Sequence, residues 1–365
     1  MSARFLTVVL ERAFNMRDGF GREIDYMRIS VIDSCNLNCY YCNPCDNNEH
    51  CHALNILSVK EVLCIVRAAT RLGIKHFRLT GGEPLLHPQL DEMVLQIKKI
   101  PGVSSVSLTT NAVLLAQHAK WLKEAGIDSI NVSLDTIDAS EYERITKKPL
   151  LEEVKHGINA AIECGIRVKI NVVLTPQTDV VALTRYVAKK GTDIRFIEMM
   201  PVGEGHTNGV EPYKKVIGTL SKLYGEPCRI NTEKTKEINS GNDKRKIPDN
   251  GPAEYYIFPE LGIRVGLIQA IHGKFCDTCN RIRVTADGRL MPCLGSSVTM
   301  DLVPDSWDFA DDVEKDFAIV RALRAAIKAK PRCHNFNDNA VTYTKTTEIE
   351  AAEVNAARNM SRIGG

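Results

Sequence analysis

The sequence lacks an apolar run of the 18 or more residues that a membrane-spanning helix needs, so we expect a soluble protein. It also lacks an excess of either charge, because 47 Lys and Arg residues against 45 Asp and Glu give a formal net charge of +2. A nearly balanced chain gives no reason to expect nucleic acid or a membrane surface as a partner. Any anionic substrate must therefore be bound by a local group of Arg and Lys side chains.

A secretory signal is also missing from the first twenty residues. Arg4, Arg12 and Arg17 are interrupted by Glu11 and Asp18, and no apolar segment there ends in a cleavage site. We expect a cytoplasmic protein, with an organellar leader as the alternative. The twelve cysteines then indicate metal binding rather than disulfide bonds, because disulfide frameworks belong to short secreted chains.

Short β-branched segments alternate with helical patterns from about residue 26 to residue 200. Four helical patterns stop at a glycine, which adopts the left-handed conformation without steric cost, at Gly73, Gly126, Gly165 and Gly191. Repeated helix-to-strand units predict parallel strands joined by crossover helices, and six units favour an α/β partial barrel over an open doubly wound sheet. The predicted strands are residues 27–33, 76–80, 105–110, 129–135, 167–174 and 193–200.

The alternation ends after Met200, and residues 231–251 are polar and rich in Asn, Lys, Gly and Pro, as in a loop or domain boundary. Beyond them, short strand-like segments and a helical pattern over residues 313–328 predict a smaller C-terminal domain. We divide the chain into a barrel of residues 1–230 and a C-terminal domain of residues 231–365. In a parallel barrel the chemistry belongs at the carboxyl ends of the strands.

Directly after the first predicted strand, Cys35, Cys39 and Cys42 form a C-x3-C-x2-C array. Three thiolates on a short loop can bind three corners of a 4Fe-4S cluster and leave the fourth iron open to a small molecule. The alternative is a structural zinc ion held by the same three thiolates and a nearby fourth ligand. The candidates for that fourth ligand are Cys45, His50, Cys51 and His52.

A second array, C-x2-C-x13-C, contains Cys276, Cys279 and Cys293, and a zinc ion there would need His272 or Cys333 as its fourth ligand. Arg281 and Arg283 follow the second cysteine at alternating positions. Guanidinium groups present a planar fork that matches phosphate oxygens. This pair therefore predicts a polyanion, such as a triphosphate, beside the second array.

Two motifs together resemble the radical S-adenosylmethionine superfamily. They are the first cysteine array with Tyr41 before its last cysteine, and Gly81-Gly82-Glu83-Pro84 after the second predicted strand. Adjacent glycines let a backbone approach a ligand closely. The resemblance implies that S-adenosylmethionine binds the open iron and yields a 5′-deoxyadenosyl radical, so that the cofactor performs the difficult chemistry.

Both arrays in this order, with FGREIDYMRISV near the start and a final Arg-Ile-Gly-Gly, resemble the GTP 3′,8-cyclase family from about Gly19 to Gly365. The resemblance implies a lyase of molybdenum cofactor biosynthesis with two 4Fe-4S clusters, the second of which binds the guanine of GTP. Its product would be (8S)-3′,8-cyclo-7,8-dihydroguanosine 5′-triphosphate. The implied partners are a reducing electron donor and a cyclic pyranopterin monophosphate synthase that takes the product, and a homodimer is compatible with the resemblance.

Carried to matching positions, the resemblance implies two sets of contacts and four catalytic residues. The implied S-adenosylmethionine contacts are Tyr41, Gly81, Gly82, Glu83, Ser133 and Met200. The implied GTP contacts are Arg28, Arg78, Thr109, Lys169, Arg281 and Arg283. The implied catalytic residues are Arg28, Lys169 and the terminal Gly364 and Gly365, which reach the active site in this family.

Several of these residues have a purely structural reading when taken singly. Ser133 and Thr109 suit half-buried strand positions, Lys169 an exposed strand edge, and Met200 a hydrophobic core. Two other functions also stay open: a peptide maturase of the same superfamily with an auxiliary cluster, and a zinc-stabilised binding protein without catalysis. The role of Cys45 and Cys51 is not fixed by any motif.

Overall fold

The computed structural model describes residues 16–42, 55–202, 210–230, 251–296, 298–302, 312–334 and 336. Within them, a twelve-stranded sheet forms a curved wall whose first six strands are neighbours in chain order and all parallel. A doubly wound sheet would reverse its order at a central strand. The α/β partial barrel is therefore confirmed, and the open sheet is excluded.

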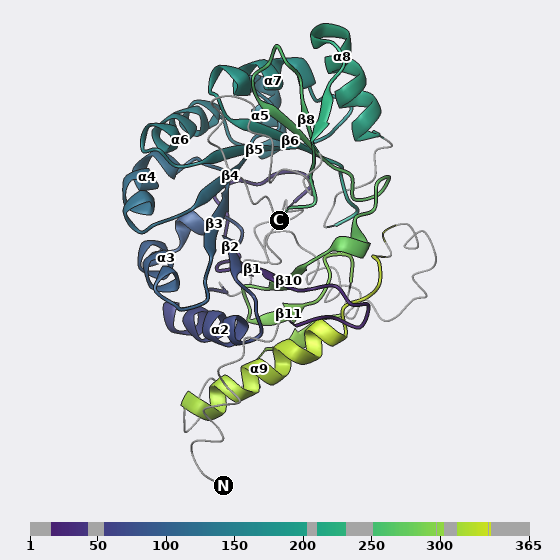
Figure 1. Cartoon of the computed structure of the whole chain (residues 1–365). Helices are drawn as coiled ribbons and strands as arrows, with labels where there is room; N and C mark the ends of the chain where they lie inside the picture. Colours follow the sequence, from purple (N-terminus) through teal and green to yellow (C-terminus); the bar gives the residue numbers. More distant parts are fainter. Residues whose placement is uncertain are drawn as a thin grey trace, which may run out of the picture.

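Each of the first six strands of the wall is followed by a helical segment, and the helices between these strands pack on the outer side of the wall (Figure 1). The strands are β1 (Tyr26–Ser30), β2 (His76–Thr80), β3 (Ser105–Thr110), β4 (Ser129–Ser133), β5 (Val168–Val173) and β6 (Asp193–Ile197). The helices between them are α2 (Val59–Arg71), α3 (Leu90–Lys98), α4 (Leu115–Glu124), α5 (Ala139–Thr146), α6 (Leu151–Glu163) and α7 (Val180–Lys189). The largest fully buried side chains of the core include Phe77, Phe196 and Met27.

Local signals in the sequence set the ends of these helices. At the start of α2 the Ser58 hydroxyl accepts a hydrogen bond from the backbone N–H of Glu61, whose carboxylate accepts one in return from the Ser58 N–H. The four glycines that were predicted to end helices all have positive φ, between 64° and 88°. Each therefore turns the chain from a helix into the next strand.

Strands β2 and β3 have the predicted bounds, whereas the other four end one to three residues early. The polar side chains just past these ends bond to loops instead of continuing the strand. Asp33, for example, accepts hydrogen bonds from the backbone and side chain of Asn55 at 3.2 and 2.7 Å. The carboxyl edge of the wall is thus formed by loops with their own polar contacts.

The C-terminal elements extend the wall at both edges, because β9 pairs parallel with β6 and β10 pairs parallel with β1 (Figure 1). These strands are β7 (Cys228–Ile230), β8 (Glu254–Ile257), β9 (Arg264–Ile268), β10 (Arg281–Val284), β11 (Arg289–Met291) and β12 (Met300–Asp301). The helices are α8 (Gly218–Tyr224), which continues a π-helical turn at Tyr213–Ile217, and α9 (Asp312–Lys328), which confirms the helix predicted near residues 313–328.

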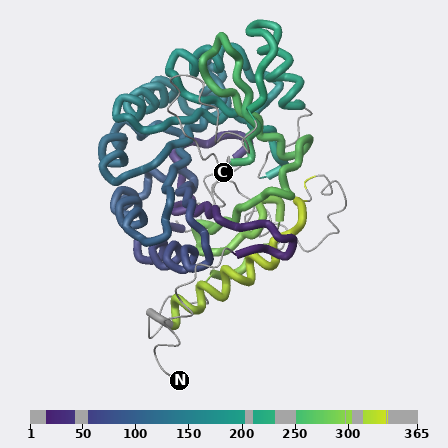
Figure 2. Tube along the Cα trace, in the orientation of Figure 1, coloured from purple at the N-terminus to yellow at the C-terminus, as the bar shows by residue number. Residues whose placement is uncertain are grey.

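The first described residues, from Met16 onward, lie beside helix α9, although the two segments are far apart in the sequence (Figure 2). Helix α9 packs against α2, where Arg71 and Asp316 form an ion pair of 2.8 Å. The Arg22 guanidinium donates to the carbonyl of Pro331 at 2.6 Å. None of the helices in the described ranges has the length and hydropathy needed to cross a membrane.

Candidate active site

The wall encloses one cavity of about 660 Å³ that is lined by both cysteine arrays. Cys35, Cys39 and Cys42 approach it from the loop after β1, and Cys276, Cys279 and Cys293 from the segments that flank β10 and β11. All six are free thiols. We call this cavity the chamber, and the two groups of cysteines the first and second triads.

The Gly81-Gly82 pair lies directly against the backbone that leads into the first triad. The Gly82 N–H donates a hydrogen bond to the Ile32 carbonyl at 2.8 Å. The N–H of the next residue, Glu83, donates one to the Ser34 carbonyl, also at 2.8 Å. A Cβ atom on Gly82 would lie 2.2 Å from the carbonyl oxygen of Ser34, and one on Gly81 2.2 Å from that of Ile32. The pair must therefore lack side chains for the cysteine loop to take this position.

We predict that Gly82→Ala lowers the free energy of unfolding by about 2–3 kcal/mol, because the overlap forces the backbone apart. The same shift moves the cysteine loop and should weaken S-adenosylmethionine binding. Urea unfolding and isothermal calorimetry measure the two effects. The matched control is Gly218→Ala in α8, where an added Cβ meets no atom within 4 Å and should stabilise by about 0.5–1 kcal/mol. Equal stability of the two variants would refute this reading.

Glu83 is fully buried and does not line the chamber. Its carboxylate accepts hydrogen bonds from the Thr110 hydroxyl and the Asn111 N–H at 2.7 Å and from the Leu85 N–H at 3.0 Å. Burial raises the pKa of this carboxyl to about 7. Glu83 thus joins the loops after β2 and β3, and a direct contact of Glu83 with S-adenosylmethionine stays a prediction.

The first triad lies in a poorly solvated environment. Burial raises the pKa of Cys35 to about 11 and that of Cys42 to about 12, and it also raises the pKa of Cys39. A cation bound to these thiols, such as the iron of a cluster, would lower their pKa values and stabilise the thiolates. The Asn111 side chain also donates to the Cys35 sulfur at 3.8 Å.

The second triad has a different electrostatic environment. Burial raises the pKa of Cys279, but the positive charges of Lys330 and Arg281 outweigh it and hold the pKa below its usual value. For Cys276, burial raises the pKa with the neighbouring thiols adding to the effect. Within this triad, cationic neighbours therefore favour the thiolate form of Cys279.

Tyr41 belongs to the loop after β1 that carries the first triad, and its hydroxyl is hydrogen-bonded to a carboxylate. Tyr41 donates to Asp135 at 2.5 Å, and the other oxygen of Asp135 accepts from the Val173 N–H at 2.8 Å. Burial raises the pKa of Asp135 to about 6. Asp135 thereby fixes the ring beside the first triad, between the ends of β4 and β5.

Five of the six predicted GTP contacts, all except Arg281, form two rows across the inner face of the wall. In the first row, Arg283, Arg28 and Arg78 are register partners on β10, β1 and β2. In the second, Thr109 is paired with Asn131, and Asn131 with Lys169, on β3, β4 and β5. Because register partners on adjacent strands present side chains to the same face, each row meets the chamber as a unit.

Positive charge dominates the chamber, whose lining holds eight Arg and Lys side chains against two carboxylates, Asp128 and Asp135. The cationic residues are Arg28, Arg78, Arg167, Lys169, Arg195, Arg281, Arg283 and Lys330. Burial and then the charges of Arg283 and Arg78 hold the pKa of Arg28 well below its usual range. These like charges repel one another, and a bound polyanion would relieve the repulsion.

Five charged chamber residues were not found from the sequence: Asp128, Asp135, Arg167, Arg195 and Lys330. Arg195 donates from Nε to the Asn171 side chain at 2.9 Å, and its buried Nη2 has no hydrogen-bond partner among the described residues. The one signal for Arg195 was its place in the strand DIRFI, where a buried Arg among apolar residues is unusual. Asp135 follows Ser133 by two positions at the end of a strand, which was a comparable signal.

The other predicted residues divide into three groups. Tyr41, Gly81, Gly82, Ser133 and Met200 line the chamber, as do all the predicted GTP contacts. The alternative zinc ligands, His272 and Cys333, do not line the chamber. The His272 ring is hydrogen-bonded to the Glu198 carboxylate, and Cys333 is exposed to solvent. Outside the described residues lie Cys45, His50, Cys51, His52, Gly364 and Gly365.

Comparison with known proteins agrees with this geometry. A Radical SAM superfamily model matches residues 29–182, and a Molybdenum Cofactor Synthesis C model matches residues 192–336. The GTP 3′,8-cyclase of Clostridium perfringens is 35% identical over 324 residues, which cover 88% of this chain and 95% of that protein. That of Petrotoga mobilis is 34% identical over 357 residues, covering 96% and 100%. The chain belongs to the GTP 3′,8-cyclase family.

Solved structures of other radical S-adenosylmethionine proteins share the fold alone. Streptococcus suis SuiB bound to the precursor peptide SuiA has a TM-score of 0.54 at 14% identity, over 88% of this chain and 69% of that one. Native anSMEcpe with bound AdoMet has a TM-score of 0.51 at 18% identity, over 73% and 74%.

The cofactors of the GTP 3′,8-cyclase family, two 4Fe-4S clusters and S-adenosylmethionine, fit the donors present. Each triad supplies three thiols, which could bind three irons of a 4Fe-4S cluster and would leave the fourth iron without a protein ligand. Among the described residues, no three His, Cys, Asp or Glu side chains converge on a point where one ion would sit. Thiolates that each bind a different iron of a cluster need not converge in this way.

Proposed function

We propose that this protein is a GTP 3′,8-cyclase that converts GTP to (8S)-3′,8-cyclo-7,8-dihydroguanosine 5′-triphosphate in molybdenum cofactor biosynthesis. One observation carries the proposal: two three-cysteine triads line one chamber together with rows of Arg and Lys side chains. A chamber of this charge suits a triphosphate. The triads would hold a radical-generating site and a second iron site for the base of the substrate.

The residues of the first loop bind and orient the cofactor. When bound, the reduced first cluster and S-adenosylmethionine supply a radical able to remove a hydrogen atom from the ribose. Tyr41, held by Asp135, together with Gly82, Ser133 and Met200, lines the side of the chamber where S-adenosylmethionine would lie. The surrounding wall limits the access of water to this reaction.

The rows of basic residues bind the substrate. The guanidinium groups of Arg283, Arg28 and Arg78 would bind the phosphate oxygens. Arg281, the first residue of β10, would add a fourth guanidinium group. Lys169 is 5% exposed, and its ammonium lies 6.0 Å from the centre of the Tyr255 ring. With Thr109 in the same row, it would contact the ribose and its phosphates. The catalytic roles that the family resemblance implies for Arg28, Lys169, Gly364 and Gly365 are part of this proposal.

Other parts of the proposal concern the whole protein. The first unit would be the barrel of residues 1–230, and the second the cluster-binding and GTP-binding residues 231–365. A low-potential reductant would deliver electrons in the cytoplasm, and a cyclic pyranopterin monophosphate synthase would consume the product. The charge of the chamber favours the cyclase over a peptide maturase, because a peptide substrate does not require so many cations.

The decisive test is anaerobic incubation of the reconstituted protein with reductant, S-adenosylmethionine and GTP that carries deuterium at C3′. We expect the deuterium to appear in 5′-deoxyadenosine, together with a nucleotide that has lost the label and elutes apart from GTP. Mass spectrometry of both compounds measures this. Unlabelled 5′-deoxyadenosine with unchanged GTP would keep the superfamily and exclude the cyclase.

A further inference from the structure

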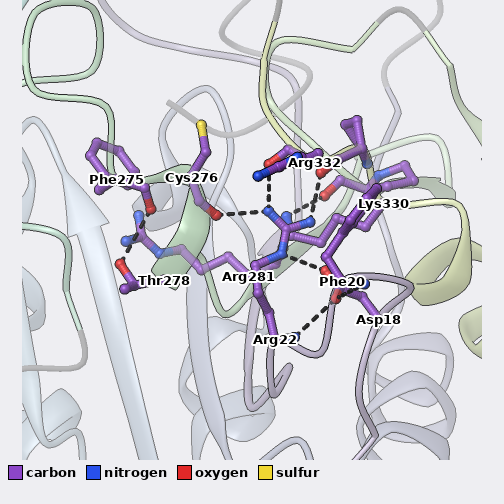
Figure 3. Close-up of polar contacts among 11 residues, drawn as sticks. Asp18, Phe20, Arg22, Phe275, Cys276, Thr278, Arg281, Lys330 and Arg332 are labelled. Carbon is purple, nitrogen blue, oxygen red and sulfur yellow. Dashed lines mark hydrogen bonds and ion pairs between the residues drawn. The ribbon is translucent and has the colours of Figure 1, made fainter.

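Arg22 and Lys330 are buried cations that lie behind the second triad and bond to its backbone. Arg22 is 8% exposed; its Nη1 donates to the carbonyl oxygen of Cys276 at 2.7 Å and to that of Arg332 at 2.9 Å. Its Nε pairs with Asp18 at 2.5 Å (Figure 3). The Arg22 guanidinium thus connects the turn that contains Asp18, the ligand Cys276 and the segment after α9 that contains Arg332.

Lys330 connects the other two ligands of the same triad. Its side chain belongs to a residue that is only 3% exposed, and its Nζ donates to the carbonyl oxygens of Arg281 and Pro292, both at 2.8 Å. Arg281 follows Cys279 by two positions, and Pro292 directly precedes Cys293. One ammonium therefore joins carbonyl groups within two residues of two thiols that come from different segments. Its positive charge also lowers the pKa of Cys279.

Each ligand of the second triad therefore has a carbonyl group within two residues of it that accepts a hydrogen bond from a buried cation. Burying an ammonium or a guanidinium is unfavourable unless its hydrogen bonds are satisfied. Both cations donate hydrogen bonds to carbonyl oxygens in or near the second triad. Two such groups around three cysteines fix the spacing of the thiols. Lys330 also places positive charge beside them, whereas the charge of Arg22 is balanced by Asp18.

We infer that Arg22 and Lys330 are positioning residues of the second cluster, an inference that rests on the proposed function insofar as a cluster is bound there. They hold the three thiols at a fixed spacing before iron binds. Lys330 in addition stabilises the more negative, reduced form of the cluster, because its charge lies beside the Cys279 ligand. Partners just outside the ligands are known to control metal affinity and potential in this way.

The test uses the full chain with Cys35, Cys39 and Cys42 replaced by serine, so that only the second triad can hold a cluster. In this parent, Lys330→Met is expected to release iron to a chelator about 10-fold faster. Its reduction potential, followed by electron paramagnetic resonance during titration, is expected to fall. Lys330→Arg keeps the charge and should keep the potential near that of the parent, and Arg22→Met should speed iron release with a smaller change in potential.

The matched control is Lys215→Met. Lys215 likewise donates its ammonium protons to two carbonyl oxygens, those of Thr175 at 2.9 Å and Pro176 at 2.7 Å, but it does not line the chamber. This variant should lower thermal stability and leave iron release and potential unchanged. If Lys330→Met retains iron and potential like the parent, or if Lys215→Met changes them equally, the inference is wrong. A parent chain that binds no iron at all would instead contradict the proposed function.

Discussion

Replacing Cys279 by serine is expected to abolish the conversion of GTP while leaving the reductive cleavage of S-adenosylmethionine in place. Cys279 belongs to the second triad, and the first triad is fixed by other contacts, those of the loops after β1, β2 and β3. Losing a thiolate ligand should remove one cluster, so the iron content should fall from about eight to about four per chain. Iron analysis and the amounts of 5′-deoxyadenosine and cyclised nucleotide measure these effects.

The matched variant is Cys39→Ser in the first triad. It should lose the same amount of iron but abolish both S-adenosylmethionine cleavage and GTP conversion. The two variants therefore separate radical generation from substrate binding, which a mere loss of stability would not do. Cyclised product from Cys279→Ser at the wild-type rate would mean that the second triad has no part in the reaction.

The second large effect is expected from Arg283→Met. Arg283 is 7% exposed, lines the chamber and is the register partner of Arg28, so its guanidinium can reach the phosphates without solvent between them. A lost hydrogen bond between charged groups is worth about 1.5–3 kcal/mol, which raises the KM for GTP roughly 10- to 100-fold. The KM for GTP is measured by steady-state kinetics, and the affinity for guanosine, which has no phosphates, by a binding assay. A contact with the phosphates alone changes the first value and not the second.

Arg289→Met provides the control for this variant. Arg289 lies on the adjacent strand β11, and its side chain is 50% exposed and paired with Asp301 at 3.4 Å, away from the chamber. We expect its KM for GTP to equal that of the wild type, and binding of guanosine to be unaffected in both variants. If Arg283→Met weakens guanosine as much as GTP, Arg283 does not contact the phosphates.

Much of the barrel could be predicted because its signals are local. A glycine with positive φ ends a helix, and a capping box begins α2, whatever the rest of the chain does. The pairing of β10 with β1 and of β9 with β6 could not be predicted in this way. It depends on contacts between segments far apart in the sequence, to which no short pattern corresponds.

The same distinction explains which chamber residues were found. The cysteines stand in motifs with characteristic spacing, and the Arg28, Arg78 and Lys169 positions came with the family resemblance. Asp135, Arg195 and Lys330 carry no motif, and their roles follow from partners on other elements: Tyr41, Asn171 and the carbonyls beside Cys279 and Cys293. Glu83 shows the reverse case, since its motif predicted a ligand contact and the structure gives it three bonds within the protein.

The metal content of the anaerobically isolated chain tests the central claim most directly, namely that each of two triads facing one chamber holds an iron cluster with an open position. The account predicts a brown protein with about eight irons and about eight sulfides per chain, reduced to half by either Cys39→Ser or Cys279→Ser. A colourless protein with zinc at both triads and no sulfide would contradict it.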